Sequence, residues 1–260
     1  MISDVSRRVG LVLEYDGTAY AGFQAQANAS TIQGELEEAI ARLTLAPARV
    51  YGAGRTDAGV HALGQVAAFP TGSKLTCAAL VSGLNHFLPA DIAVQAAYDV
   101  PPSFDPRRHA LSRVYQYTFL NRAVPSPLLE RQAYRVAAPL DDGAMAVALR
   151  LVNGRHDFAA LCGPVPAGKS TVRNVHSTQL WRDGEMVRFE VEANAFLPHQ
   201  MRRIAGMLES VGSGWLSLEG VLTLLNGTNT PAITDHITTA PAQGLCLMQV
   251  KYEDFPPYAY

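Results

Sequence analysis

The chain has 260 residues, of which 48% are hydrophobic and 17% are charged, and its formal net charge is −2. This composition is typical of a protein with a sizeable core in one large or two small domains, and no apolar run is long enough for a membrane-spanning helix. The slight acidity argues mildly against nucleic-acid binding, although a polyanion responds to the local potential rather than to the total charge.

The first half of the chain predicts alternating strands and helices. Strands are expected over residues 9–15, 65–69 and 92–98, and a helix is expected over residues 75–86. A further helix is expected after Ser30, because Ser30 and Gln33 match a capping box and apolar residues follow at helical spacing up to Leu43.

A proline-rich segment, residues 101–106, separates this half from a second one, because three prolines in six residues do not continue a helix or a central strand. We therefore expect two domains, residues 1–104 and 105–260. The second half predicts strands over 113–120, 172–181, 186–193 and 245–252, and helices over 141–152, 198–211 and 218–225. Both halves mix strands and helices in a similar order, which favours an α+β fold.

The cysteines and histidines do not indicate a metal site. The three cysteines, Cys77, Cys162 and Cys246, are far apart and form no C-x-x-C pair, and the histidines show no ligand spacing such as H-E-x-x-H. We expect the cysteines to be buried as small hydrophobic residues in a reducing cytoplasm. The N-terminus also lacks the apolar core of a signal peptide, which agrees with a cytoplasmic location.

The most informative stretch lies between Tyr51 and Pro70. It places Arg55 and Asp57 between two glycines, Gly54 and Gly59, just before a predicted strand. Glycines permit sharp turns, and loops at strand ends often carry functional groups. The same residues also fit a plain turn, in which the aspartate satisfies nearby backbone donors.

Residues 163–170 match the P-loop pattern G-x-x-x-x-G-K-[ST], which makes a nucleotide-binding protein a rival interpretation. A true P-loop follows a strand and opens a helix whose amides hold the phosphates. Here a strand is predicted to follow Ser170, and two prolines remove amide donors from the loop. We therefore interpret the match as coincidental. The start of a dinucleotide motif at Gly52 and Gly54 also fails, because Asp57 occupies its third glycine position.

The run Gly54 to Ala62, GRTDAGVHA, resembles the signature of the tRNA pseudouridine synthase A family. Four further segments are similar to that family: YDGT with GFQ and TIQGEL near the start, then FDPRRHALSRVYQY, FLPHQMRRIAG and APAQGLCL, at residues 15–36, 104–117, 196–206 and 240–247. The third of these departs from the usual family pattern at Pro198, Gln200 and Met201. The resemblance thus extends over nearly the whole chain.

The resemblance implies two related halves, each like a ferredoxin or RNA-recognition-motif fold with mixed, mainly antiparallel sheets, meeting at a central catalytic cleft. It identifies Asp57 as the catalytic nucleophile, Tyr115 as the active-site tyrosine that stacks on the uracil, and Arg202 as the active-site arginine. Further arginines are expected to contact the RNA backbone or hold the extruded nucleotide: Arg55, Arg107, Arg108 and Arg113.

The implied reaction is the isomerisation of uridine to pseudouridine at positions 38, 39 and 40 in the anticodon stem-loop of tRNA, by a homodimer. The bond from N1 to the ribose breaks, the uracil turns over and C5 joins C1′, so nothing is oxidised and no cofactor is needed. An RNA-binding protein without chemistry remains the alternative on the same scaffold, and the joint presence of Asp57, Tyr115 and Arg202 argues against it.

Overall fold

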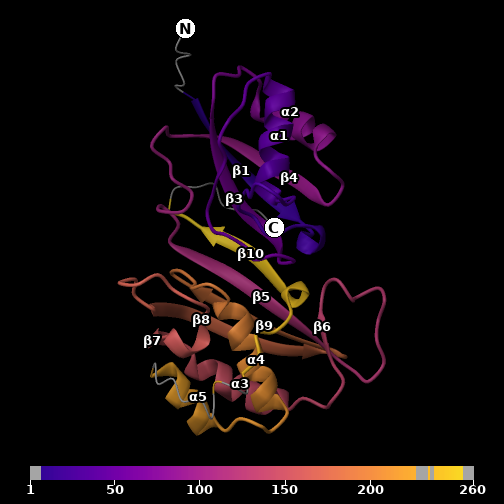
Figure 1. Cartoon of the computed structure of the whole chain (residues 1–260), viewed down its shortest axis with the longest axis vertical. Helices are drawn as coiled ribbons and strands as arrows, with labels where there is room; N and C mark the ends of the chain where they lie inside the picture. Colours follow the sequence, from indigo (N-terminus) through magenta and orange to yellow (C-terminus); the bar gives the residue numbers. More distant parts are fainter. Residues whose placement is uncertain (1–6, 227–233, 235–236, 254–260) are drawn as a thin grey trace. The chain divides into compact units, whose positions relative to one another are not determined.

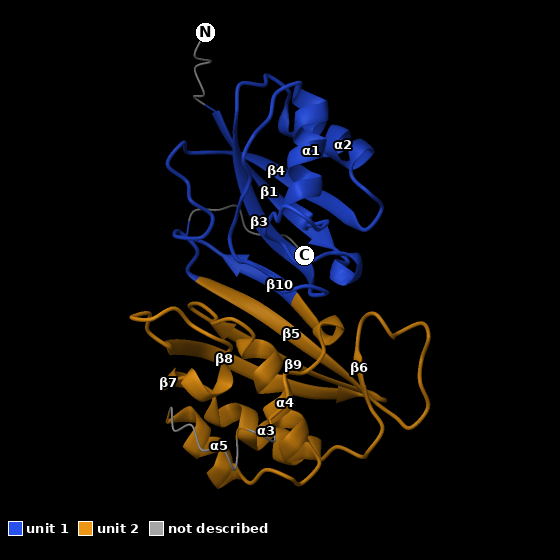
Figure 2. Cartoon of the chain, viewed as in Figure 1, with its two compact units in different colours: residues 1–111, 247–260 blue, residues 112–246 orange. Residues whose placement is uncertain are grey.

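The computed structural model describes residues 7–226, 234 and 237–253. The chain forms two compact units (Figure 2). Unit 1 comprises residues 1–111 and 247–260, and unit 2 comprises residues 112–246. The first boundary thus falls after the proline-rich segment, and the end of the chain belongs with the first unit.

Unit 1 is built on an antiparallel sheet in which β1 lies between β3 and β4, with two helices and a short 3₁₀ turn, η1 (Figure 1). The helices pack against each other, and α2 also packs on β4. The end of β10 belongs here too, where the Leu111 amide donates to the Lys251 carbonyl (2.8 Å). The elements are β1 (Arg7–Tyr15), η1 (Gly17–Ala19), α1 (Ile32–Thr44), β2 (Tyr51–Gly52), β3 (His61–Thr71), α2 (Cys77–Phe87), β4 (Ile92–Val100) and β10 (Leu245–Lys251).

The predicted helix after Ser30 forms, but its cap is the next residue. The Thr31 side chain accepts the Gly34 amide, whereas the Ser30 hydroxyl donates to the Glu35 carboxylate. Gln33 does not complete a capping box, because its side chain is buried and bonds to residues outside the helix, including the Val50 carbonyl. A tertiary contact has therefore overridden a local pattern.

Unit 2 contains an antiparallel sheet in the order β5-β9-β8-β7, with β6 pairing parallel to β5. Three helices gather together in this unit, with α3 packed on β8 and against both α4 and α5 (Figure 1). The elements are β5 (Ser112–Asn121), β6 (Tyr134–Val136), α3 (Asp142–Leu151), β7 (Gly154–Asp157), η2 (Ala159–Leu161), β8 (Val172–Asp183), β9 (Met186–Ala193), α4 (Gln200–Gly212), α5 (Leu218–Leu225) and η3 (Ala242–Gly244).

These elements confirm an α+β fold with mainly antiparallel sheets. The helix predicted over 218–225 forms with those bounds, and the Ser217 hydroxyl caps it by accepting the Gly220 amide. The predicted hairpin closes at Gly184, whose φ of 57° suits glycine. The short strands β6 and β7 were not predicted, because three or four residues carry too little periodicity.

The prediction that the cysteines are buried was wrong. All three cysteines are only half-buried. Among residues 7–226, 234 and 237–253, no group of three or more His, Cys, Asp or Glu side chains is arranged to hold a metal ion. No helix within that part of the chain is both long and apolar enough to cross a membrane.

Candidate active site

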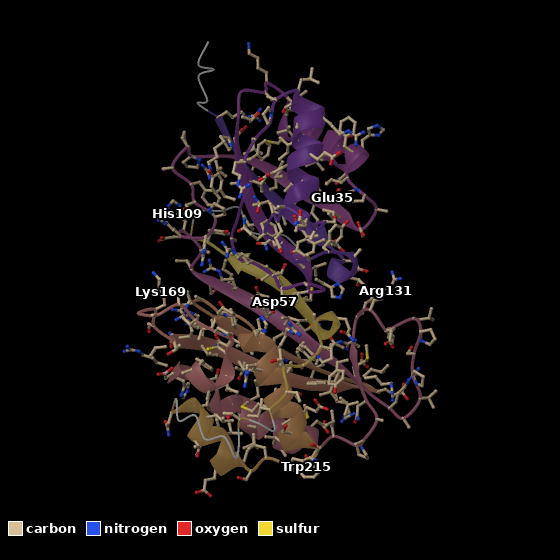
Figure 3. The ribbon with its side chains drawn as sticks, viewed as in Figure 1. Glu35, Asp57, His109, Arg131, Lys169 and Trp215 are labelled. Carbon is tan, nitrogen blue, oxygen red and sulfur yellow. The ribbon has the colours of Figure 1, made fainter. Side chains whose placement is uncertain are left out.

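Asp57 lies in unit 1, on the loop that leads into β3 (Figure 3). The residue before it is held by its side chain: the buried Thr56 hydroxyl hydrogen-bonds to the Tyr15 hydroxyl (2.9 Å). Two residues further back, the Gly54 carbonyl accepts the side-chain amide of Gln65 (2.9 Å), which is itself completely buried. The backbone on the N-terminal side of Asp57 is therefore fixed by polar side chains from β1 and β3.

The backbone of the loop after β1 also forms hydrogen bonds with the segment around Asp57. The Phe23 amide donates to the Thr56 carbonyl (3.1 Å), and the Gly59 amide donates to the Tyr20 carbonyl (3.3 Å). On the C-terminal side of Asp57, Gly59 adopts a φ of 78°, the left-handed conformation that glycine takes without a steric penalty. Asp57 thus sits on a short turn that is tied down at both ends.

Two glycines before α1 allow the close approach of these loops. A Cβ atom on Gly17 would collide with the Val60 carbonyl oxygen, and one on Gly22 would lie 2.6 Å from the Thr56 carbonyl oxygen. Gly22 also has a φ of 95°, which strains any L-residue with a side chain. The Gly17 amide meanwhile donates to Nδ1 of His61 (3.1 Å), at the start of β3. The YDGT and GFQ segments are therefore the support of the signature loop.

Tyr115 lies in unit 2, on β5, where it pairs with Val191 of β9. It is buried, and its ring meets the Phe196 ring edge-on, with the centroids 4.9 Å apart. This edge-to-face geometry fixes the plane of the tyrosine ring. Tyr117, two residues on, is fully buried, and its hydroxyl donates to the Pro241 carbonyl (2.8 Å). Burial raises the pKa of Tyr117, which keeps that hydroxyl protonated.

Arg202 also lies in unit 2, in the first turn of α4. Its Nε donates to the Ala240 carbonyl (2.8 Å), and the Ala240 amide donates back to the Arg202 carbonyl (3.0 Å). The segment before β10 is held tightly against α4, because a Cβ on Gly206 would collide with the Thr238 carbonyl. The APAQGL segment therefore orients Arg202, which is half-buried.

The departures from the family pattern before Arg202 are accommodated locally. Gln200, at the first position of α4, is completely buried, and its side-chain oxygen accepts the Leu197 amide (2.8 Å). The preceding residue, His199, has a φ of 57° and turns the chain into the helix. Met201 packs into the core of the unit.

The other predicted site residues fall into two groups. Arg55, Arg107 and Arg108 are exposed in unit 1, and the Arg108 guanidinium forms a long ion pair with Asp105 (3.8 Å). Arg113 differs, because it is buried in unit 2 and donates to the Asn194 carbonyl (2.9 Å). It secures the start of β5 to the chain that leaves β9.

The segment that matches a P-loop does not have the structure of one. It is followed by the strand β8, as predicted, and not by a helix. Lys169 is exposed on a turn in which its own amide donates to the Pro166 carbonyl (3.1 Å; Figure 3). The segment does not itself open a helix whose N-terminal amides could hold phosphates, as a P-loop does.

Sequence reasoning missed the polar residues that support Asp57. The sequence places Gln65 and Tyr15 in predicted strands and Thr56 in the signature run, but none of these patterns indicates that their side chains support Asp57. A signal was present, because a glutamine inside the run QVAAF occupies a position that the strand buries, and a buried amide needs partners.

The comparisons with known proteins agree with these motifs. The family model described as tRNA pseudouridine synthase matches residues 11–107 and 148–253. A tRNA pseudouridine synthase A from Geobacter sp. (strain M21) is 44% identical over 95% of this chain and 100% of its own length. One from Myxococcus xanthus is 43% identical over 96% of this chain and 94% of its own length.

Among solved structures, a chain in the "Crystal Structure of a Cbf5-Nop10-Gar1 Complex" aligns with 80% of this chain and 46% of its own length, at 13% identity and a TM-score of 0.36. A TM-score this low demonstrates no shared fold. The assignment rests on the sequence relatives, which match almost from end to end. This chain therefore belongs to the tRNA pseudouridine synthase family.

Proposed function

We propose that the protein converts uridine to pseudouridine at positions 38, 39 and 40 in the anticodon stem-loop of tRNA, with Asp57 as the nucleophile. The reaction class, an isomerisation on tRNA, follows from family membership. The observation that carries the role of Asp57 is its loop, where GRTDAGVHA is held on both sides of the aspartate by Tyr15, Gln65 and the backbone of residues 17–23.

A fixed carboxylate suits covalent catalysis. The nucleophile attacks the nucleotide and holds it while the bond between N1 and the ribose breaks and the uracil turns over. A carboxylate on a rigid backbone loses little entropy in reaching the attacking geometry, which is how positioning lowers a barrier. The bond from C5 to C1′ then forms, the C5 proton departs and the carboxylate is released. The step balances without an oxidant, a reductant or a transferred group.

Tyr115 and Arg202 serve the same reaction in this proposal. Tyr115 presents a ring whose plane is set by Phe196, and stacking of a base on an aromatic ring is worth about 1–3 kcal/mol. Its hydroxyl is the candidate group for removing the C5 proton. Arg202, oriented by Ala240, supplies a permanent positive charge that favours the ionised form of a carboxylate.

The target uridine lies in a folded stem and must leave the stack, at a cost of a few kcal/mol. Contacts with RNA phosphates offset this cost. The exposed guanidinium groups of Arg55, Arg107 and Arg108 are the candidates in unit 1 for holding the extruded nucleotide and its backbone. Arg113 already donates to the Asn194 carbonyl, so we propose that it supports the RNA-binding surface structurally.

Two finer points complete the proposal. The protein acts as a homodimer, which analytical ultracentrifugation at micromolar concentration would test directly. It works in the cytoplasm, where its substrate tRNA is made in bacteria such as those that carry its relatives.

The proposed substrate position can be tested by mapping pseudouridine. Unmodified tRNA transcripts with uridine at position 38, 39 or 40 are incubated with the protein, and carbodiimide-induced reverse-transcription stops locate the product. Stops at these positions, lost when each uridine is replaced by cytidine, are expected. Stops elsewhere in the tRNA would contradict the proposed specificity while leaving the reaction class intact.

A further inference from the structure

A second group of basic side chains lies in unit 2, around Cys162. Residues 162–163 are tied to the start of α4, because the Gly163 amide donates to the Pro198 carbonyl (2.8 Å). Arg203 follows one turn later on that helix, its amide bonded to the His199 carbonyl (2.9 Å). On the other side, Arg173 in β8 pairs with His156 in β7, the strand that leads to Cys162.

The two arginines of this cluster have no anionic partner among the described residues. The Arg203 side chain forms no hydrogen bond or ion pair with any residue in the described part of the chain, and its Nε is buried without an acceptor. Arg173 donates through Nη1 to the Ser170 and Val172 carbonyls, but its Nε is also buried and unsatisfied. A buried donor on a charged group is costly unless it finds an acceptor.

The acidic groups nearby do not supply that acceptor. Burial raises the pKa of the Cys162 thiol, against the opposing charges of Arg203 and Arg173, so the thiol stays neutral. Asp157 acts on the same thiol, but its carboxylate accepts the Ala159 amide and forms no ion pair with a described cation. The cluster therefore holds two unneutralised positive charges on a partly exposed surface.

We infer that Arg173 and Arg203 form a binding site for a phosphodiester of the RNA substrate. The inference rests on the proposed function for the identity of the ligand. Guanidinium groups with free N–H donors match phosphate oxygens in geometry and charge. A bound phosphate would accept from the guanidinium groups and neutralise the cluster. The contact lies outside the residues assigned above to the chemistry and extends the RNA contacts of unit 2.

The test is the salt dependence of tRNA binding. Each phosphate contact contributes about 0.7 to 0.9 to the slope of log Kd against log[KCl]. Arg203→Gln should lower the slope by that amount, so that wild type loses about threefold more affinity than the variant between 50 and 200 mM KCl. Arg173→Gln should do the same, and Arg203→Lys should keep the wild-type slope because it keeps the charge.

The matched control is Arg150→Gln, which removes one exposed arginine from α3 in the same unit. It should change neither the slope nor the melting temperature. Because the Arg203 side chain has no described partner, Arg203→Gln should melt at or above the wild-type temperature. A lower melting temperature with an unchanged slope would make Arg203 a structural residue and overturn the inference.

A further experiment, melting in the presence of inorganic phosphate, distinguishes an RNA phosphodiester from a free anion as the ligand of this site. If inorganic phosphate raises the melting temperature of wild type but not of Arg203→Gln, while the tRNA slope is unchanged, the site takes a free anion and the RNA assignment fails. Failure of the proposed function looks different. Wild type would then bind tRNA without forming pseudouridine, and the slope comparison would still decide the role of the two arginines.

Discussion

The hydrogen bond between Tyr15 and Thr56 offers a quantitative test of how the nucleophile loop is held. Both side chains are buried, at 3% and 6% exposure, and their hydroxyls lie 2.9 Å apart. Tyr15→Phe and Thr56→Val are nearly isosteric, so each removes one hydroxyl and leaves the other buried without that partner. The expected cost is about 1–3 kcal/mol for either variant.

The double variant leaves neither hydroxyl of the pair behind, so it should be more stable than the sum of the single effects by about 1–2 kcal/mol. Urea unfolding should be followed by circular dichroism, because both tryptophans, Trp181 and Trp215, lie in unit 2 and do not report on unit 1. Tyr51→Phe, on an exposed tyrosine of unit 1, is the matched control and should have no effect.

The same single variants test whether the Tyr15–Thr56 hydrogen bond contributes to catalysis by positioning Asp57. Loss of either hydroxyl loosens the backbone next to Asp57, so kcat should fall roughly tenfold to hundredfold, with folding intact in the absence of urea. Strictly additive stabilities would show that the two hydroxyls do not interact. An unchanged kcat in both single variants would refute the idea that Thr56 positions Asp57.

Three shorter predictions follow from other parts of the molecule. Tyr115→Phe keeps the ring against Phe196, so tRNA affinity should persist while kcat falls; full activity would exclude the hydroxyl from proton transfer. Lys169→Ala should leave isomerisation unchanged and ATP unbound, because a strand follows its loop, and lost activity would revive the nucleotide interpretation. Burial raises the pKa of Glu209. The Tyr134 hydroxyl donates to the Glu209 carboxylate (3.2 Å) and offsets part of this rise in pKa. The stability that the protonated form provides is present at low pH and lost as pH rises through the raised pKa. Glu209→Gln should therefore exceed wild type in stability at pH 7, with the difference shrinking towards pH 4; a less stable variant at pH 7 would contradict this.

Local patterns predicted the elements whose signals are contained within a few residues. The helix over 218–225 has its own cap in Ser217 and its own apolar face, and the hairpin at Gly184 needs only a turn that accepts a positive φ. The cap of α1 shows the limit. Ser30 and Thr31 are both good caps; the folded chain uses Thr31, and the Gln33 side chain bonds to distant backbone instead of completing a capping box with Ser30.

The candidate site likewise combines a feature that the sequence reveals locally with contacts that only the folded chain reveals. The signature loop was recognisable as a string of residues, but its rigidity comes from Gln65, Tyr15 and two glycines elsewhere in the chain. Such contacts join residues up to 50 positions apart, as between Tyr15 and Gln65 (3.4 Å), and no periodicity marks them. The unsatisfied Nε atoms of the two arginines beside Cys162 were equally hidden, because a missing acceptor is a property of the folded chain.

The central claim is that Asp57 is the nucleophile of a cofactor-independent uridine isomerase. The most direct measurement is tritium release from tRNA labelled with 5-³H-uridine, without ATP or added metal, comparing wild type with Asp57→Ala and Asp57→Asn. Wild type should release tritium, and both variants should bind tRNA but lose about 10⁴-fold or more in kcat. Release by either variant at a rate near that of wild type would contradict the account.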